Sequence, residues 1–400
     1  MFCKVYVLFA LLPIFSSDGC PKKCSCGLID IVQCGFKGLR SNNVIRSEDI
    51  PQILNNLPRN TEKLEFINNK FSKFDITGVK EIPSLKELSF DEAYQFSTIP
   101  INISKVFPQL ESFMLWNGGK ISYLTNQNLR FPNLRKLWIN KGKLTELPAD
   151  LFQYTPRIQR ISLGWHNISK VSEYAFRGMN TKHFESLNLR GNSLTEIPSK
   201  AFDYFAGSEI KNLALFTNKI KRIKKNAFSA FKSIRYLDLR TNMINKIDNK
   251  AFQDVKIEYL DLGGNPVSHF THEVDGLKWI RFKILWNAWT IVPGLSTKNY
   301  FQCTCEFAKW LRKMKNNNSD FEALGTCQQD ESKKKFTDWW IISRLQVPLM
   351  NVTMEKYCTP CERAGNCSKG EKSKGENIMT SASMLATCFG VLICILSYAV

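Results

Sequence analysis

The stretch Phe184–Leu194 reads FESLNLRGNSL, and three later stretches repeat its pattern of apolar residues. They are Ile210–Ile220 (IKNLALFTNKI), Ile234–Ile244 (IRYLDLRTNMI) and Ile257–Val267 (IEYLDLGGNPV). Each fits the pattern L-x-x-L-x-L-x-x-N-x-L, in which x is any residue. Such a repeat predicts a chain built from stacked copies of one small unit rather than from separate globular domains.

The second apolar position of this pattern recurs through most of the chain. It is filled by Leu64, Leu88, Phe113, Leu137, Ile161, Leu187, Leu213, Leu237, Leu260 and Phe282. The successive spacings are 24, 25, 24, 24, 26, 26, 24, 23 and 22 residues. A period this steady lies far outside chance, so residues 59–298 are predicted to hold about ten repeats.

Apolar residues alternate within each unit, as Leu187 and Leu189 do. This alternation predicts a short strand with its apolar side turned inward. One unit cannot bury that side alone, so neighbouring units stack and share a continuous core. A row of phenylalanines with a similar period is expected to stack in the same core. These residues are Phe152, Phe176, Phe202, Phe228 and Phe252.

An asparagine follows the strand in most units, where its side chain can bond backbone groups that the turn leaves unpaired. The residues at this position are Asn69, Asn192, Asn218, Asn242, Asn265 and Asn287. In units two to five the position is taken by Ala93, Gly118, Gly142 and His166. We therefore expect less regular turns there, and we expect the four histidines to be surface or turn residues.

Cysteines gather on both sides of the repeats. Four precede them (Cys20, Cys24, Cys26 and Cys34) and four follow them (Cys303, Cys305, Cys327 and Cys358). Because a solenoid needs its open ends covered, each set is predicted to form two disulfides, in caps spanning residues 20–58 and 299–367. Four cysteines allow three pairings. Cys361 and Cys367 remain and can pair with each other.

The two ends of the chain carry targeting patterns. Lys4, the apolar run Val5–Phe15 and the small residues that follow predict a cleaved signal peptide over residues 1–19. A polar stalk (368–383) and a second apolar run, Met384–Val400, have the pattern of a GPI-attachment signal, with Ser373 as candidate attachment site. A short transmembrane tail is the alternative. Both place the protein on the outer face of the plasma membrane, through the secretory pathway.

The 400 residues carry 55 Lys and Arg against 36 Asp and Glu, a formal net charge of +19. Removing residues 1–19 and those after Ser373 takes away Lys4, Asp18, Lys374 and Glu376, whose charges cancel. The charge therefore stays with the mature chain. Outside the cell it favours acidic proteins or sulfated glycans as partners and argues against nucleic acid.

Cysteine caps around repeats of about 24 residues resemble those of the extracellular leucine-rich repeat family. The segment FQCTCEF (301–307) is similar to the C-terminal cap of Toll-like receptors, and the GPI-like end is similar to that of variable lymphocyte receptors. The resemblance implies an α/β solenoid, a horseshoe with a parallel concave sheet and disulfide caps at both ends. It also implies the pairs Cys303–Cys327 and Cys305–Cys358. The sequence lacks a TIR domain and a Thr/Pro-rich stalk, so no subfamily is assigned.

The binding face is predicted on the concave side, where the strand residues that alternate with the buried ones point outward. The candidates are Trp116, Trp138, Asn140, Arg160, Arg190, Phe216, Tyr236, Asp238, Arg240, Tyr259 and Asp261. Exposed Trp, Tyr and Arg are enriched at interface hot spots. The hypothesis is a cell-surface receptor or adhesion protein that binds a macromolecule, most simply a protein. Alternatively, the aromatic residues pack only on one another.

A second hypothesis is a matrix protein that binds sulfated glycans through basic residues on the rim of the solenoid. Its candidates are Lys219, Lys221, Arg222, Lys224 and Lys225. Further basic groups lie at 309–315 and 333–335. Such clusters are also common on ordinary solvated surfaces.

Glycosylation sequons fall outside the predicted strands, which keeps the concave face free of sugar. They begin at Asn102, Asn167, Asn317, Asn351 and Asn366. The sequence shows no H-E-x-x-H, G-x-S-x-G or phosphate-loop motif. We therefore expect no enzyme, cofactor or metal site.

Overall fold

The computed structural model describes most of the repeats and part of each cap. The described residues are 19–27, 30–35, 44–67, 71–91, 93–267, 269–270, 281–284, 308–309, 311–312, 316, 322–328 and 346–348. The polar stalk, Ser373, the C-terminal apolar run and nearly all of the signal peptide lie outside them. Among the described residues, no helix is long and apolar enough to cross a membrane.

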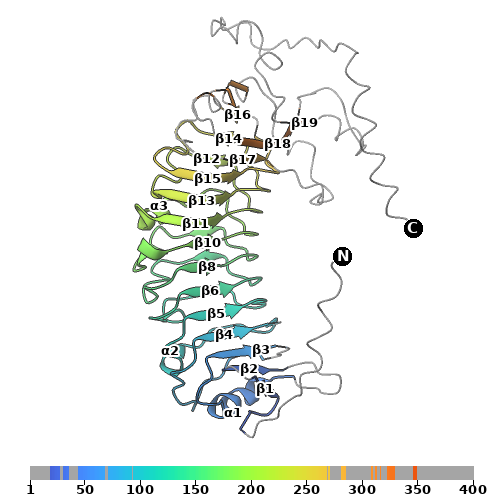
Figure 1. Ribbon diagram of the computed structural model, residues 1–400, viewed down its shortest axis with the longest axis vertical. Coiled ribbons are helices and arrows are strands. Elements are labelled where there is room, and N and C mark those ends of the chain that lie inside the picture. The colour runs from blue at the N-terminus through green and yellow to red at the C-terminus, as the bar shows by residue number, and fades with distance from the viewer. Residues whose placement is uncertain are drawn as a thin grey trace, which may run out of the picture.

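One sheet of 14 strands runs through the molecule, with its strands stacked one above another (Figure 1). Its strands, in order, are β1 (Cys24–Cys26), β2 (Ile31–Cys34), β3 (Lys63–Phe66), β4 (Glu87–Phe90), β5 (Ser112–Leu115), β6 (Lys136–Ile139), β8 (Arg160–Ser162), β10 (Ser186–Asn188), β11 (Glu209–Ala214), β13 (Ser233–Asp238), β15 (Lys256–Asp261), β17 (Arg281–Ile284), β18 (Glu322–Gln328) and β19 (Gln346–Pro348). Only the outermost pairs, β1–β2 and β18–β19, are antiparallel.

The register of the sheet aligns the ten marker residues in one row. Leu64 pairs with Leu88, and each marker residue then pairs with the next one as far as Phe282. Val32 of β2 precedes this row and Ala323 of β18 follows it. The sheet therefore continues from the repeats into both flanking segments.

The return segments between strands hold little helix. The helical elements are α1 (Ile50–Asn55), α2 (Ile103–Val106), α3 (Ser199–Phe202) and the 3-10 turns η1 (Ser47–Asp49), η2 (Thr181–His183) and η3 (Asp203–Phe205). Short parallel strands form two small sheets beside the main one. They are β7 (Glu146–Leu147) with β9 (Lys170–Val171), and β12 (Arg222–Ile223), β14 (Lys246–Ile247) and β16 (His269–Phe270).

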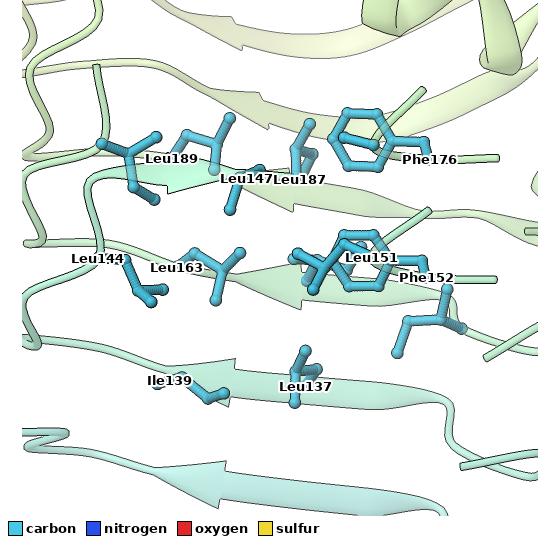
Figure 2. Packing of buried hydrophobic residues seen from close by; sticks show 14 of the residues in the cluster. Leu137, Ile139, Leu144, Leu147, Leu151, Phe152, Leu163, Phe176, Leu187 and Leu189 are labelled. Atoms are coloured by element: carbon cyan, nitrogen blue, oxygen red, sulfur yellow. The ribbon is translucent and has the colours of Figure 1, made fainter. Parts of the chain in front are cut away.

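The core is a single apolar cluster that extends from unit to unit. Figure 2 shows its repeated layers, with Leu137 and Ile139 of β6 below Leu163, and Phe152 below Phe176. The predicted phenylalanine row is confirmed, because all five of its residues are fully buried. Phe152 stacks on Phe176 and Phe228 stacks on Phe252, with ring centroids 5.7 and 5.8 Å apart. At Phe202 the row is interrupted, because Phe205 packs on Phe176 instead.

Buried asparagines tie the turns of units six to nine to their neighbours, as the sequence pattern predicted, while Asn69 and Asn287 lie outside the described residues. The Nδ2 group of Asn218 donates to the carbonyl oxygens of Leu189 (3.0 Å) and Leu215 (2.9 Å), and its Oδ1 accepts from the amide of Leu194 (3.1 Å). Asn192, Asn242 and Asn265 make the equivalent bonds. The ladder thus satisfies three backbone groups per unit that the turn would otherwise leave unpaired.

His166 performs the same task with an imidazole. Its Nδ1 accepts from the amide of Leu144 (3.3 Å), and its Nε2 lies 2.7 Å from the carbonyl oxygen of Ile139. The ring fills the space left by Gly142, because a Cβ added to that glycine would lie 2.5 Å from the imidazole. His166 is a turn residue, as expected, and it is buried, with only 5% of it exposed.

The expectation of less regular turns in units two to five is wrong for units four and five, but units two and three do depart from the later turns. Strands β3 to β6 pair one residue further than the later strands, so that Phe66, Phe90, Leu115 and Ile139 lie side by side. From unit four onward, the turn after each strand places one residue in the left-handed region. These residues are Lys141, Trp165, Gly191, Thr217, Thr241 and Gly264. The left-handed turn residue is therefore present from unit four onward, whereas in units two and three the strand pairing runs one residue further toward the turn.

The N-terminal cap contains two disulfides, Cys20–Cys26 and Cys24–Cys34. They select one of the three pairings that the sequence left open, and they join β1 to β2 at the end of the sheet. Cys303, Cys305, Cys358, Cys361 and Cys367 lie outside the described residues. Cys327 lies in β18, but its side chain is not among the described parts, so the C-terminal pairing stays a prediction.

Replacing Asn218 by alanine is expected to destabilise the protein by about 3 kcal/mol or more, because each buried backbone group left unpaired costs about 1–3 kcal/mol. Urea unfolding followed by circular dichroism measures this loss. Asn126→Ala is the matched control, since Asn126 is only partly buried and its side chain makes long hydrogen bonds to Gln153 and Gln127. Equal unfolding midpoints for the two variants would contradict the role assigned to the ladder.

His166 is expected to make stability fall in mild acid. Burial lowers the pKa of this imidazole, only partly opposed by its hydrogen bond to Ile139, so the folded chain binds its proton less readily than the unfolded chain. Its contribution to stability is complete above the unfolded pKa of about 6.5 and declines as the pH falls below it. His166→Asn should lose less stability than wild type between pH 7.5 and 5.0 in urea titrations. An unchanged pH dependence in that variant would refute the role given to His166.

Candidate binding face

The predicted binding residues occupy two of the outward rows of the main sheet and the residue just after each strand. Trp116 is 47% exposed, and Trp138, Arg160, Arg190 and Phe216 are partly exposed. Tyr236, Arg240 and Tyr259 are also partly exposed. The structure therefore brings eight of the eleven candidates to the concave surface, in two groups along the column.

The first group is a tryptophan pair on β6 and just after β5. The rings of Trp116 and Trp138 stack with their centroids 6.3 Å apart and their planes 15° apart. Mutual packing, the alternative interpretation of these residues, is thus real. It does not hide them, since nearly half of Trp116 stays exposed.

The second group is built around Arg240, next to β13. Its guanidinium donates to both carboxylate oxygens of Asp238 (2.9 and 2.7 Å) and lies 3.6 Å from Asp261. The hydrogen bond to Asp238 raises the pKa of Arg240 above its usual value, with burial opposing. Burial, reinforced by Asp238 and Asp261, raises the pKa of Tyr236 to about 12. Tyr236 is therefore neutral and Arg240 charged at any physiological pH.

Aromatic contacts extend this second group along the row. The Phe216 ring lies between the guanidinium groups of Arg190 and Arg240, which are 5.7 and 5.1 Å from its centroid. Tyr236 and Tyr259 lie side by side with centroids 6.3 Å apart. The side chains are held by neighbours in the adjacent repeats, which fixes the surface they present.

Three candidates are not exposed, and for them the expectation of a solvent-facing side chain is wrong. Asn140 accepts hydrogen bonds from Ser162 Oγ and the Gly164 amide, both 2.9 Å. Asp238 bonds Arg240, and Asp261 accepts from the amide of Gly263 (3.0 Å). Short polar side chains reach nearby donors and become buried. These three position their neighbours rather than offering contacts of their own.

A hollow of about 580 Å³ lies on the concave face beside the tryptophan pair. Its lining includes Trp116, Asn117, Lys141, Trp165 and Arg190. Trp165 was not among the sequence candidates, because it follows the strand in the turn and not in the alternating pattern. The only signal was its type, since a bulky residue stands in the row that otherwise holds Gly, Lys or Thr.

The basic candidates lie apart from this face, on β12 and the residues around it. Lys219, Lys221 and Lys225 are exposed and join no ion pair among the described residues. Arg222 instead pairs with Asp248 (2.6 Å), and Lys224 pairs with Glu196 (2.5 Å). Two of the five predicted cations are therefore partly neutralised.

The described sequons avoid the main sheet. Asn102 is exposed immediately before α2, and Asn167 is exposed in the turn after β8. Asn317, Asn351 and Asn366 lie outside the described residues. In the described part of the chain, no group of three or more His, Cys, Asp or Glu residues could hold a metal ion.

The repeats also match a known family model. Residues 145–271 match six copies of the BspA type leucine-rich repeat region. This part of the chain is therefore a leucine-rich repeat region. The same parallel strand pairing continues beyond the matched residues on both sides, from Leu64 to Phe282.

Several curated leucine-rich repeat proteins are similar in sequence. Human leucine-rich repeats and immunoglobulin-like domains protein 1 is 25% identical over 58% of this chain and 20% of its own length. Toll-like receptor 3 of Boselaphus tragocamelus is 28% identical over 54% and 28%. Mouse podocan is 25% identical over 62% and 38%. The chain thus covers well under half the length of these relatives.

Solved structures show the same fold. A chain of the Toll-like receptor 13 complex with single-stranded RNA matches 66% of this chain and 36% of its own length, with a TM-score of 0.52 and 22% identity. A chain of the octameric complex of latrophilin 3, Unc5D and FLRT2 matches 78% and 95%, with a TM-score of 0.54 and 20% identity.

Proposed function

We propose that this leucine-rich repeat protein binds a protein ligand through its concave face and acts in recognition or adhesion rather than in catalysis. The observation that carries the proposal is the set of aromatic and arginine side chains held on the outward rows. Trp116, Trp138, Phe216 and Arg240 are each held by a neighbouring repeat. Because such a surface is already ordered, a partner loses little side-chain entropy on binding it.

The proposal places the protein outside the cell. Two disulfides in the N-terminal cap favour an oxidising compartment. The signal peptide over residues 1–19, glycosylation at Asn102 and Asn167, and a GPI anchor at Ser373 or a membrane tail over 384–400 belong to the same proposal. A protein is preferred to nucleic acid as the ligand because of this location.

The test compares two double variants of the full chain. Trp116→Ala/Trp138→Ala removes the tryptophan pair, and Tyr123→Ala/Tyr174→Ala removes two exposed rings on return segments. Surface-labelled cell proteins retained by each are identified, and a partner is then purified. Its Kd should rise at least about 30-fold for the tryptophan variant, as expected for a hot spot worth ~2 kcal/mol, and stay unchanged for the tyrosine variant. Equal retention by both variants would exclude the concave face.

A second candidate function is binding of sulfated glycans on the flank of the solenoid. Strands β12, β14 and β16 place Arg222, Lys246 and His269 directly side by side. Adjacent strands are about 4.8 Å apart, so Arg222 and Lys246 bring two basic side chains to neighbouring positions, and His269 follows them in the backbone register. Lys219, Lys221 and Lys225 lie on the same turn as β12. This row suits a linear polyanion, whose attraction depends on the ionic strength.

The glycan hypothesis is tested by heparin-column elution of two variants with the same change in net charge. The flank variant carries glutamine at Lys219, Lys221, Lys225 and Lys246. The control carries glutamine at the exposed residues Lys80, Lys105, Lys120 and Lys182. The flank variant should elute at a clearly lower salt concentration than wild type, and the control close to it. If both variants eluted at equally lowered salt concentrations, net charge alone would explain heparin binding and a site on the flank would be rejected.

A further inference from the structure

Trp165 and Arg190 cross over each other between two neighbouring repeats. Trp165 follows Gly164 in unit five, and Arg190 precedes Gly191 in unit six. A Cβ added to Gly191 would lie 2.4 Å from the indole of Trp165, and one added to Gly164 would lie 3.0 Å from Cγ of Arg190. Each large side chain thus lies against the glycine of the adjacent turn. The amide of Trp165 also donates to the carbonyl oxygen of Arg190 (2.8 Å).

This arrangement is costly to the fold. Trp165 has a φ of 60°, a left-handed conformation in which bulky residues are rare. It is nevertheless 43% exposed, so burial of its ring does not explain the conformation. Lys141, Thr217 and Thr241 take the same left-handed conformation at the corresponding turn position, so this φ belongs to the turn of the repeat. Trp165 differs from them because a bulky ring stands there and stays partly exposed.

Arg190 is the cation beside this ring that no carboxylate neutralises. Its Nε is buried without a hydrogen-bond partner, and none of the described acidic residues forms an ion pair with it. Its neighbours on the same face differ, since Arg160 bonds Glu185 (2.6 Å) and Arg240 bonds Asp238. Because this nitrogen is also closed off from solvent, an anion in the hollow would bond the outer nitrogens of the guanidinium, whose charge no described carboxylate neutralises.

Both side chains line the 580 Å³ hollow of the concave face, together with Trp116. The polar and charged residues of its lining include Asn117, Lys141, Glu65 and Asp91. Pockets for small groups have volumes of about 300–1,000 Å³. Two half-exposed indoles offer flat apolar surfaces to the C–H face of a sugar ring. Amide, ammonium and carboxylate groups around them can bond hydroxyls, and the guanidinium can bind a carboxylate through two parallel hydrogen bonds.

We propose that this hollow recognises a sugar ring bearing a carboxylate, seated on Trp165 with its acid group on Arg190. The inference rests on the proposed use of the concave face and names the chemistry of part of its ligand, a glycan carried by the partner. The net charge of the chain, +19, attracts acidic ligands at long range, although the lining of the hollow itself sets Lys141 and Arg190 against Glu65 and Asp91. Arg190 makes the local preference, because a neutral sugar would leave its charge without a counter-ion.

The test measures binding of defined oligosaccharides to the full chain by titration calorimetry. The two acidic probes are 3′-sialyllactose, with a terminal sialic acid, and a hyaluronan tetrasaccharide, with hexuronic acids. Lactose is the neutral probe. At least one acidic probe is expected to bind at least tenfold more tightly than lactose, and the one that binds identifies the type of sugar acid. Equal affinity for all three, or no binding of either acidic probe, would overturn the proposal.

Variants connect the binding to the two residues. Arg190→Gln should weaken binding of the acidic probe at least tenfold. Arg190→Lys should weaken it less, because lysine keeps the positive charge but lacks the planar guanidinium that can bond a carboxylate twice. Trp165→Gly suits the positive φ, so this variant is expected to fold at least as stably as wild type yet lose binding. Arg177→Gln, at an exposed arginine paired with Asp150, is the control and should bind normally.

Two outcomes separate this inference from the general function. Full affinity for the acidic sugar in Arg190→Gln or Trp165→Gly would refute the inference even if the tryptophan-pair variant loses its protein partner. A glutamate-rich peptide that binds as tightly as the acidic sugar and is lost in Arg190→Gln would assign Arg190 to an acidic protein segment instead. That result would overturn the proposal of a sugar ligand but would leave the concave face as the binding surface.

Discussion

No repeat of this protein can bury its apolar residues alone, and every other feature depends on this constraint. Leu187 of β10, for example, is covered only because Ile161 and Leu213 lie in register on either side. Each repeat is therefore stabilised mainly by its contacts with the nearest repeats along the column. The buried asparagines link neighbouring repeats through polar groups as well. The side-chain amide of each one donates to a carbonyl oxygen of the previous turn and to one of its own turn.

The alternating pattern predicted the register and the core well because burial has a period of two along a strand. The ten marker residues pair as expected, and the phenylalanine row lies in the core. Side-chain exposure was harder to predict. Asp238 and Asn140 stand at outward positions, yet they become buried because a local guanidinium or amide is within reach. Pattern alone cannot show such bonds, which depend on the adjacent repeat.

The turns were the least predictable part. Trp165 and His166 are consecutive, and both break the pattern that the other units follow. His166 replaces an asparagine by matching its hydrogen bonds with two ring nitrogens, and Trp165 accepts an unfavourable backbone conformation. Turn positions are set by hydrogen bonds and φ values, which apolar periodicity does not report. The most distinctive residues of the concave face therefore came from the structure.

The contact between Gly142 and His166 makes these two positions interdependent in evolution. Restoring asparagine at position 142 while the imidazole is present would force atoms within 2.5 Å of each other. Once asparagine stands at 166, the same change is compatible with the ladder seen in Asn192 and Asn218. Substitutions in contact are not additive, so the order in which they occur decides which are tolerated. A consensus redesign of these repeats must therefore change Gly142 and His166 together or leave both as they are.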